Sequence, residues 1–203
     1  MSEGSLPRVI HFVTGGFSGA TQVAIDLARA NLDAGHFEPV LVLRRKRSTA
    51  MERVARLRES GLRVEVVPGW SHAATLWALW RLCRRLRPQL MVAHGFPEHL
   101  LGRHAALWAG VPHLVQVEHN SRERYTPWRL AQARWLARRS DAIVGVSAGV
   151  EQTLLRLGMP PAITQHIPNG IDVSRFTAVP SLAAREPGIV MSARFARQKD
   201  HLT

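Results

Sequence analysis

Apolar and polar positions alternate along this chain in blocks, and the blocks predict a regular succession of strands and helices. Short apolar runs, typical of buried parallel strands, occupy residues 9–13, 37–43, 62–67, 89–95, 112–118, 141–146 and 163–167. Longer segments with helical periodicity lie between them, at residues 20–34, 51–60, 73–87, 98–109, 127–139 and 147–157. Such alternation is typical of parallel sheets with right-handed crossovers. We therefore expect an α/β fold, a Rossmann-like parallel sheet of about seven strands with helices on both faces.

Residues at the ends of these segments support the expected helices. Glycines follow three of the helical segments, at Gly35, Gly61 and Gly110, where a left-handed residue commonly ends a helix. Thr126 and Pro127 have the residue types preferred at the N-cap and the first helical position. The helix boundaries are therefore indicated by local chemistry as well as by periodicity.

The last part of the chain has a different pattern. Asn169-Gly170 marks a sharp turn, because both residues tolerate a positive φ. Residues 177–186 have no periodicity, Pro180 and Pro187 bracket this stretch, and a new apolar run begins at Gly188. We expect an N-terminal domain at residues 1–176, a linker at 177–187, and the start of a second domain at 188–203.

Composition narrows the class of protein. The chain has 203 residues, of which 46% are hydrophobic, which suits one substantial globular domain. Its single cysteine, Cys83, excludes an intramolecular disulfide and fits a reducing compartment. Neither an N-terminal signal segment nor a run of about 18 apolar residues is present, so we expect a cytoplasmic protein.

The chain is strongly basic, with a formal net charge of +12. Residues 44–63 hold eight basic and two acidic residues, and the helix that follows carries Trp77, Arg81, Arg84 and Arg85 on one flank. Tryptophan beside arginine suits a membrane interface, and a core helix with solvated arginines is the alternative interpretation. We expect the two basic regions to share one side of the domain. Charge alone leaves three partners open: nucleic acid, an anionic membrane and phosphorylated substrates.

Residues that could carry chemistry follow the predicted strands. In open parallel sheets, ligands bind at the carboxyl ends of the strands. The loop 14–19 after the first strand is rich in glycine and opens a helix, an arrangement that can hold phosphate. The candidates at this edge are Gly15, Gly16, His94, Gly95, His119, Asn120 and Ser147.

Two motifs near the end of the chain resemble a known family. The segment Ile167–Phe176 reads IPNGIDVSRF, and residues 190–199 read VMSARFARQK. This pattern resembles the interdomain hinge of family 4 retaining glycosyltransferases of the GT-B fold. In that family the hinge closes the N-terminal Rossmann-like domain. The resemblance covers nearly the whole chain and is most specific at the hinge.

The resemblance implies roles for the candidate residues. His119 matches the active-site histidine, which contacts the donor sugar. Arg194 and Lys199 match the two cations that hold the donor diphosphate, with Gly15 and Gly16 in the glycine loop. His94, Gly95, Asn120 and Ser147 are expected to contact acceptor or substrate, and Asn169 and Gly170 to form the hinge. The chain has no D-x-D motif, so neither a metal nor a cofactor is implied beyond the nucleotide-sugar substrate.

The family's activity is transfer of a sugar from a nucleotide-diphosphate donor, with retention of configuration. The expected acceptor is a lipid-linked or cell-surface glycan of the lipopolysaccharide, capsule or exopolysaccharide type. Such an enzyme would be cytoplasmic and peripheral on the inner face of the cell membrane. The family's acidic motif and nucleotide pocket would lie beyond Thr203, so we expect this chain alone to be inactive.

Two other functions compete with this one. A nucleotide-sugar epimerase of the GT-B fold is the first, although epimerases lack the hinge as written here. A basic nucleic-acid-binding module is the second, suggested by the charge. Its basic residues, however, lie on predicted helices that match no recognition motif, and we expect no nucleic-acid partner.

Overall fold

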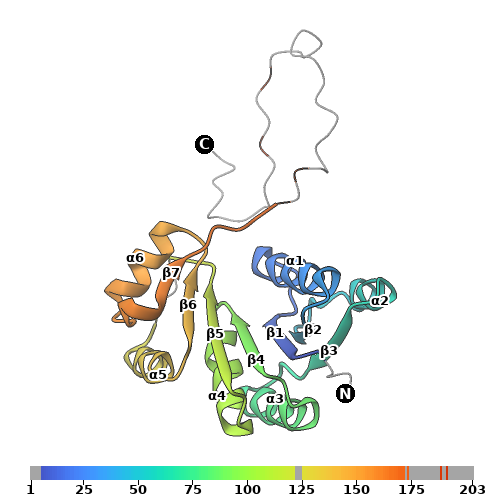
Figure 1. Ribbon diagram of the computed structural model, residues 1–203, viewed down its shortest axis with the longest axis horizontal. Helices are drawn as coiled ribbons and strands as arrows, with labels where there is room; N and C mark the ends of the chain where they lie inside the picture. Colours follow the sequence, from blue (N-terminus) through green and yellow to red (C-terminus); the bar gives the residue numbers. More distant parts are fainter. Residues whose placement is uncertain (1–5, 122–124, 172, 174–187, 189–190, 192–203) are drawn as a thin grey trace. The chain divides into compact units, whose positions relative to one another are not determined.

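The computed structural model describes residues 6–121, 125–171, 173, 188 and 191, which include a seven-stranded parallel sheet (Figure 1). The strand order is β3-β2-β1-β4-β5-β6-β7. The strands are β1 (Arg8–Thr14), β2 (Glu38–Arg44), β3 (Arg63–Val67), β4 (Leu90–His94), β5 (His113–Glu118), β6 (Ala142–Gly145) and β7 (Thr164–His166). This sheet confirms the α/β, Rossmann-like fold expected from the sequence.

Six α-helices connect the strands among the residues described. They are α1 (Gly19–Ala34), α2 (Met51–Glu59), α3 (His72–Leu86), α4 (Glu98–Ala109), α5 (Pro127–Ala137) and α6 (Ala148–Arg156), and a short 3-10 turn, Pro161–Ile163, precedes β7. The expected caps are present. Gly35 and Gly110 follow their helices with positive φ angles of 66° and 78°, and the Thr126 hydroxyl accepts from the Arg129 amide.

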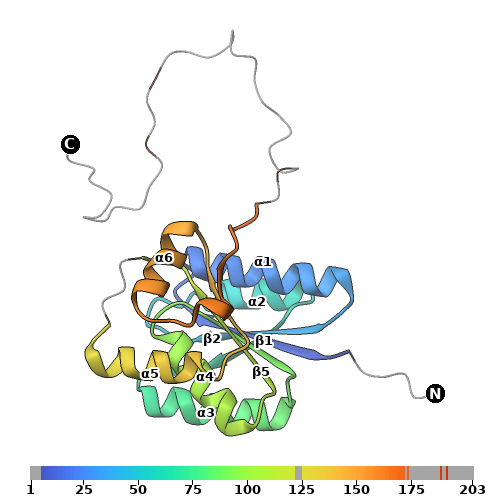
Figure 2. The ribbon, with the colours of Figure 1, turned by 60° about the vertical axis from the view of Figure 1, so that its left-hand side comes forward.

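The helices cover both faces of the sheet. On one face α1 and α2 pack against Val13, Leu41 and Leu43, with Ile25 and Val54 at the helix contacts. The other face carries α3 and α4, which pack against the alternate side chains of β1, β2 and β4. Figures 1 and 2 show α1 and α2 on one side of the sheet and α3, α4 and α5 on the other. Cys83 is buried in the second of these cores, as expected.

One expectation about the surface is wrong. The basic stretch 44–63 includes α2, whereas Trp77, Arg81, Arg84 and Arg85 lie on α3. These two helices cover opposite faces of the sheet, so the two basic regions do not share one side. The reason is the strand order: the connection from β3 to β4 crosses back over β2 and β1, and right-handed crossovers then place α3 on the other face.

The compact unit of the sheet ends at Asn169, where the expected hinge begins. Asn169 and Gly170 are both exposed. The linker at 177–187 and nearly all of the segment 188–203 lie outside the described residues, so these two domain boundaries stay predictions. Within the described part of the chain, no helix is long and apolar enough to cross a membrane.

Candidate functional site

The strand order reverses at β1. Strand β1 pairs with β2 on one side and with β4 on the other. The sheet continues from β2 to β3 on the first side, and from β4 to β5, β6 and β7 on the second. In open α/β sheets such a reversal leaves a crevice at the carboxyl ends of the strands, where ligands bind. The candidate residues after β1, β4 and β5 all belong to this edge.

The glycine loop after β1 is packed tightly against the end of β2. The Gly15 amide donates to the Arg44 carbonyl over 2.8 Å, and a Cβ on Gly15 would lie 2.6 Å from the same oxygen. A side chain at this position would therefore clash, which gives Gly15 a packing role of its own. Gly16 is exposed beside Lys46, so its backbone faces solvent.

His94 and Gly95 meet His119 across adjacent strands. His94 is the last residue of β4, and the Gly95 amide donates to the Val117 carbonyl of β5 over 2.8 Å. Gly95 has a φ of 69°, a conformation that glycine adopts at little cost. The His94 and His119 rings stack with their centroids 5.5 Å apart. The structure thus brings together these three residues, which lie at the ends of two different strands in the sequence.

A third histidine, His11 of β1, extends this pair into a line. His11 Nδ1 lies 3.3 Å from His94 Nε2, and His94 Nδ1 lies 3.3 Å from His119 Nε2. On the far side, the Asn31 amide nitrogen of α1 lies 3.2 Å from His11 Nε2. His11 and His94 are buried, whereas His119 is partly exposed at the edge. The line therefore runs from α1 across β1 and β4, along the α1 face of the sheet, to the candidate site.

All three imidazoles are neutral at pH 7. Burial lowers the pKa of His11 to about 4 and that of His119 also to about 4. The pKa of His94 is held well below its ordinary value by burial first, and then by the neighbouring charges that protonated His11 and His119 would carry. A neutral imidazole can donate one hydrogen bond and accept another, but it brings no positive charge to a ligand.

The backbone of His119 is held by a second network, which begins at Glu118. This buried carboxylate ends β5, and its Oε1 accepts from the His119 amide over 3.0 Å. Its Oε2 faces the Tyr125 hydroxyl at 3.5 Å, and that hydroxyl lies 2.7 Å from Nε2 of His99 in α4. The loop carrying His119 is thereby tied to the helix that follows β4.

The second network ends at a fully buried arginine. Arg103 Nη2 lies 2.8 Å from His99 Nδ1, its Nε donates to the His99 carbonyl, and its Nη1 donates to the Ser140 hydroxyl. Burial lowers the pKa of Arg103 to about 10, so the guanidinium remains charged at pH 7. Burial and the Arg103 charge hold the pKa of His99 well below its usual range. His99 Nδ1 therefore accepts from Arg103, and Nε2–H donates to Tyr125.

A buried ion pair fixes two loops of the same edge. Arg44 ends β2 and Glu98 is the first residue of α4. Arg44 Nη1 lies 3.3 Å from Glu98 Oε1, and both side chains are nearly buried. A carboxylate at a helix N-terminus is also stabilised by the helix dipole. Because Gly15 packs on the Arg44 backbone, this pair connects the glycine loop after β1 to the loop after β4.

The other expected site residues are less informative. Ser147 caps α6, with its hydroxyl accepting from the Val150 amide, and it is exposed after β6. Asn120 is exposed directly after His119. Arg194 and Lys199 lie outside the described residues. Among the side chains that are described, no group of three or more His, Cys, Asp or Glu residues could hold a metal ion.

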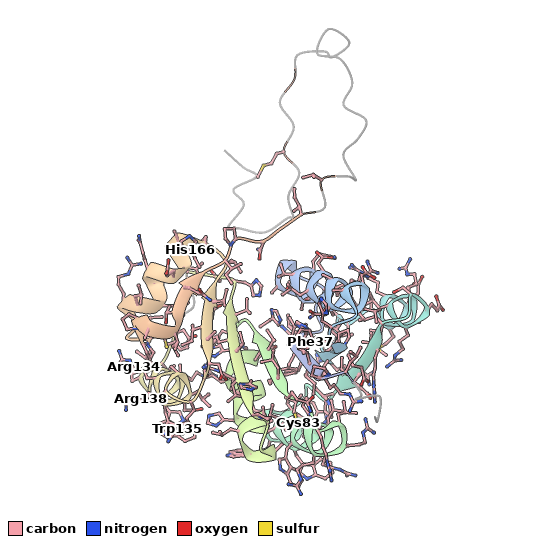
Figure 3. The ribbon with its side chains drawn as sticks, in the orientation of Figure 1. Phe37, Cys83, Arg134, Trp135, Arg138 and His166 are labelled. Carbon is pink, nitrogen blue, oxygen red and sulfur yellow. The ribbon has the colours of Figure 1, made fainter. Side chains whose placement is uncertain are left out.

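Two hollows lie away from the reversal of strand order at β1. One of about 390 Å³ is lined by Arg84, Arg87, Gln89 and Pro112, at the amino ends of β4 and β5. Cys83, labelled in Figure 3, also lines it. The other, of about 310 Å³, lies between β3 and α3. The first lies at the amino ends of its strands, and the second lies along the outer strand β3, away from the reversal at β1 where parallel sheets bind ligands.

Sequence reasoning missed several residues of this site: His11, Asn31, His99, Arg103 and Glu118. A histidine inside the apolar run 9–13 was the one available signal, since a polar residue in a buried strand needs a partner. The remaining residues belong to helices and strands whose periodicity says nothing about a shared network.

The chain matches the sequence model of a known protein family. Residues 17–175 match the model of Glycosyltransferase Family 4. No curated protein sequence is significantly similar to the chain.

Several solved structures share the fold. The HepE protein of Anabaena, crystallised with UDP and glucose, has a TM-score of 0.70 at 18% identity, over 86% of this chain and 47% of its own. A glycosyltransferase from Rickettsia africae has a TM-score of 0.72 at 13% identity, over 86% and 46%. A putative UDP-N-acetylglucosamine 2-epimerase from Listeria monocytogenes has a TM-score of 0.56 at 15% identity, over 79% and 44%. At these identities the likeness concerns the fold, and the chain spans under half the length of each structure.

Proposed function

The chain belongs to glycosyltransferase family 4, and from this premise we propose that it is the N-terminal, acceptor-side domain of a retaining glycosyltransferase. The enzyme moves a hexosyl group from a nucleotide-diphosphate donor to a lipid-linked or cell-surface glycan. The acceptor class is that of lipopolysaccharide, capsule or exopolysaccharide assembly. Family membership also argues against a nucleic-acid-binding module.

The observation that carries this proposal is the position of His119. It lies at the carboxyl edge beside the point where the strand order reverses, stacked on His94 and partly exposed. Since its pKa is about 4, His119 acts at pH 7 as a neutral hydrogen-bonding group rather than as a base. This suits a contact with an uncharged sugar hydroxyl, the role that the family resemblance assigns to it.

Support for a uridine nucleotide donor comes from the structural relatives. HepE was crystallised with UDP-glucose as well as with UDP. We propose that this protein also uses a nucleotide-sugar, with Gly16 at the exposed loop after β1 near the diphosphate. Arg194 and Lys199 would neutralise the diphosphate as it leaves, which stabilises the negative charge that develops in the transition state. No cofactor or metal takes part in the proposed reaction.

The acceptor is proposed to reach the enzyme at a membrane surface. Trp77 is 58% exposed on α3, with the Arg81 guanidinium 4.7 Å from its ring centroid. Arg84 and Arg85 are exposed on the same helix, and Arg85 is paired with Glu65 at 3.0 Å. Arginines near an anionic leaflet each contribute about 1 kcal/mol, and a tryptophan anchors in the headgroup layer. A cytoplasmic enzyme could thus meet a lipid-linked acceptor in two dimensions.

The test is a transfer assay with the full-length protein that carries this domain. Purified protein is incubated with UDP-glucose, UDP-N-acetylglucosamine or GDP-mannose, each with and without an extract of glycan-bearing lipids. We expect release of the nucleoside diphosphate with one donor, dependent on the lipid extract, and a labelled sugar in the lipid fraction. Nucleoside diphosphate release without any labelled acceptor would contradict the proposed acceptor class.

The same assay distinguishes a transferase from an epimerase, the alternative suggested by the fold shared with the Listeria protein. An epimerase would convert UDP-N-acetylglucosamine to its 2-epimer with no acceptor present and no sugar transferred. That product would overturn the proposal of transfer.

A further inference from the structure

The line of Asn31, His11, His94 and His119 has a consequence for the active-site histidine. Its members come from α1, β1, β4 and the residue after β5. The facing nitrogens of neighbouring rings lie 3.3 Å apart. In His11 and in His94, both ring nitrogens lie within hydrogen-bond distance of a partner. Since His11 and His94 are buried, water does not compete for these contacts.

A chain of neutral imidazoles has a direction. Each ring carries one N–H donor and one acceptor nitrogen, so a donor entering at one end determines which nitrogen of every later ring holds the proton. Burial lowers the pKa values of His11 and His119, so these rings stay neutral and each keeps one donor and one acceptor nitrogen. The direction is then set by the group at the closed end.

That group is Asn31. Its amide nitrogen can only donate, so His11 Nε2 accepts and His11 Nδ1 carries the proton. His11 Nδ1–H donates to His94 Nε2, and His94 Nδ1–H then donates to His119 Nε2. The proton of His119 is left on Nδ1, which has no hydrogen-bond partner among the residues described.

We propose that Asn31, acting through His11 and His94, holds His119 in the tautomer whose proton is on Nδ1, so that His119 presents an N–H donor to its ligand. Asn31, His11 and His94 are positioning residues, whereas His119 touches the substrate. The ligand atom is an acceptor oxygen, and its assignment to a hydroxyl of the donor sugar rests on the proposed function.

The arrangement has a chemical advantage. A free neutral imidazole exchanges between two tautomers, so a ligand oxygen would meet a donor for only part of the time. A histidine held in one tautomer meets the oxygen with the N–H already in place, and less free energy is spent on ordering the group during binding. The network from Glu118 to Arg103 holds the backbone of the same residue.

The test is NMR spectroscopy of the chain labelled with ¹⁵N-histidine, without ligand, at pH 7.5. Long-range ¹H–¹⁵N correlation spectra distinguish protonated from unprotonated ring nitrogens, and single His→Gln variants assign them. We expect protonated Nδ1 and unprotonated Nε2 in His11, His94 and His119. A proton on Nε2 of His119 would overturn the proposal.

The variant Asn31→Leu keeps the size of the side chain and removes the donor. We expect the Nδ1–H form of His119, at least about fivefold in excess in the wild type, to fall to a mixture of both tautomers. Gln22→Leu, an exposed change on the same helix whose side chain bonds to Asp26, should leave the histidine spectra unchanged. Asn31→Ala serves if the leucine variant does not fold. An unchanged His119 tautomer in a folded Asn31 variant would show that Asn31 does not set the direction.

These spectra are recorded without substrate, so they are independent of the transfer assay. Failure of the transfer assay with the expected tautomer would remove the proposed ligand and leave the histidine chain in place. Successful transfer with a different His119 tautomer would contradict the proposed line of histidines and support the transferase function.

Discussion

His119 is held from two sides, by its ring and by its backbone. The ring nitrogen Nε2 contacts His94, and the amide donates to the buried carboxylate of Glu118. A side chain whose ring and backbone are both fixed loses little freedom on binding a ligand. The rigidity of this residue therefore comes from β1, β4, β5 and α4 together, not from its own loop.

Only part of this arrangement could be predicted from the sequence. His94 and His119 follow predicted strands, and the rule for parallel sheets selects them. His11 lies within an apolar run that predicts a buried strand; a histidine there indicates that a partner is needed, but not which residue the partner is. Arg103 could not be selected either, since a fully buried arginine on a helix contradicts the usual exposure of its type.

At the residue scale we predict that stability falls in mild acid. The folded protein holds His11 and His119 at a pKa of about 4, below their ordinary value of 6.5. Between these values the unfolded chain binds more protons than the folded protein, so the free energy of unfolding decreases as pH falls below 6.5. The stabilisation that the neutral histidines contribute is fully present above pH 6.5. Each histidine contributes about 1.4 kcal/mol per pH unit in this window.

The measurement is urea denaturation at pH 8, 6.5 and 5.5. The two histidines together should lower the free energy of unfolding by about 2–3 kcal/mol between pH 8 and pH 5.5. His94 and His99, whose pKa values are also well below the usual range, act in the same direction. Equal stability at pH 8 and pH 5.5 would show that these histidines are not buried as neutral groups.

At the scale of elements, the order and type of the helices and strands were predictable because each has both a periodic pattern and an end signal. The boundaries differ by a residue or two; β7, for example, begins at Thr164 after a 3-10 turn rather than at Ile163. The placement of helices on the two faces needs the strand order. The sequence pattern does not show that the connection from β3 to β4 crosses back over β2 and β1, which puts α2 and α3 on opposite faces.

Because α2 lies on the opposite face, the proposed membrane contact is limited to α3 and the helices beside it. The exposed Trp77 and its arginines lie on the same face as α4 and α5, where Trp108 and Trp135 are also exposed. Arg139 lies over the Trp135 ring, 3.9 Å from its centroid. Figure 3 shows Trp135 on α5 with Arg134 and Arg138. The tryptophans thus belong to one layer of helices, and the basic stretch of α2 to the other.

We predict that the chain sediments with anionic vesicles of phosphatidylglycerol and phosphatidylcholine, but not with phosphatidylcholine alone. The triple variant R81E/R84E/R85E should weaken binding by about 100-fold or more, since each arginine near the leaflet contributes about 1 kcal/mol and reversal also adds repulsion. Added salt should weaken the wild-type interaction, because exposed charges are screened over about 10 Å.

A matched control separates the proposed face from net charge. The triple variant R47E/R53E/R56E makes the same change in charge in the β2–α2 region, where all three arginines are exposed. It should weaken vesicle binding by less than about tenfold. Equal losses in the two variants would point to non-specific attraction, and failure of the wild type to bind either vesicle would indicate a soluble acceptor.

At the scale of the whole molecule, the fold and the family agree. The parallel sheet brings the loops after β1, β4 and β5 to one edge, and the family resemblance places its histidine after β5. The sequence could predict this convergence because a parallel sheet puts all carboxyl ends on one side. The hinge motif predicted a second domain, whose boundary and whose Arg194 and Lys199 lie outside the described residues.

The central claim is that the carboxyl edge around His119 is the active site of a glycosyltransferase. The most direct measurement compares turnover of His119→Ala and His113→Ala in the full-length protein, in the lipid-dependent transfer assay. His113 is the matched control, an exposed histidine at the opposite end of β5 that pairs with Asp141. We predict that turnover falls by about 100-fold or more in His119→Ala, the usual cost of one lost transition-state hydrogen bond, and stays within about threefold of wild type in His113→Ala. Wild-type turnover in a folded His119→Ala variant would contradict the account.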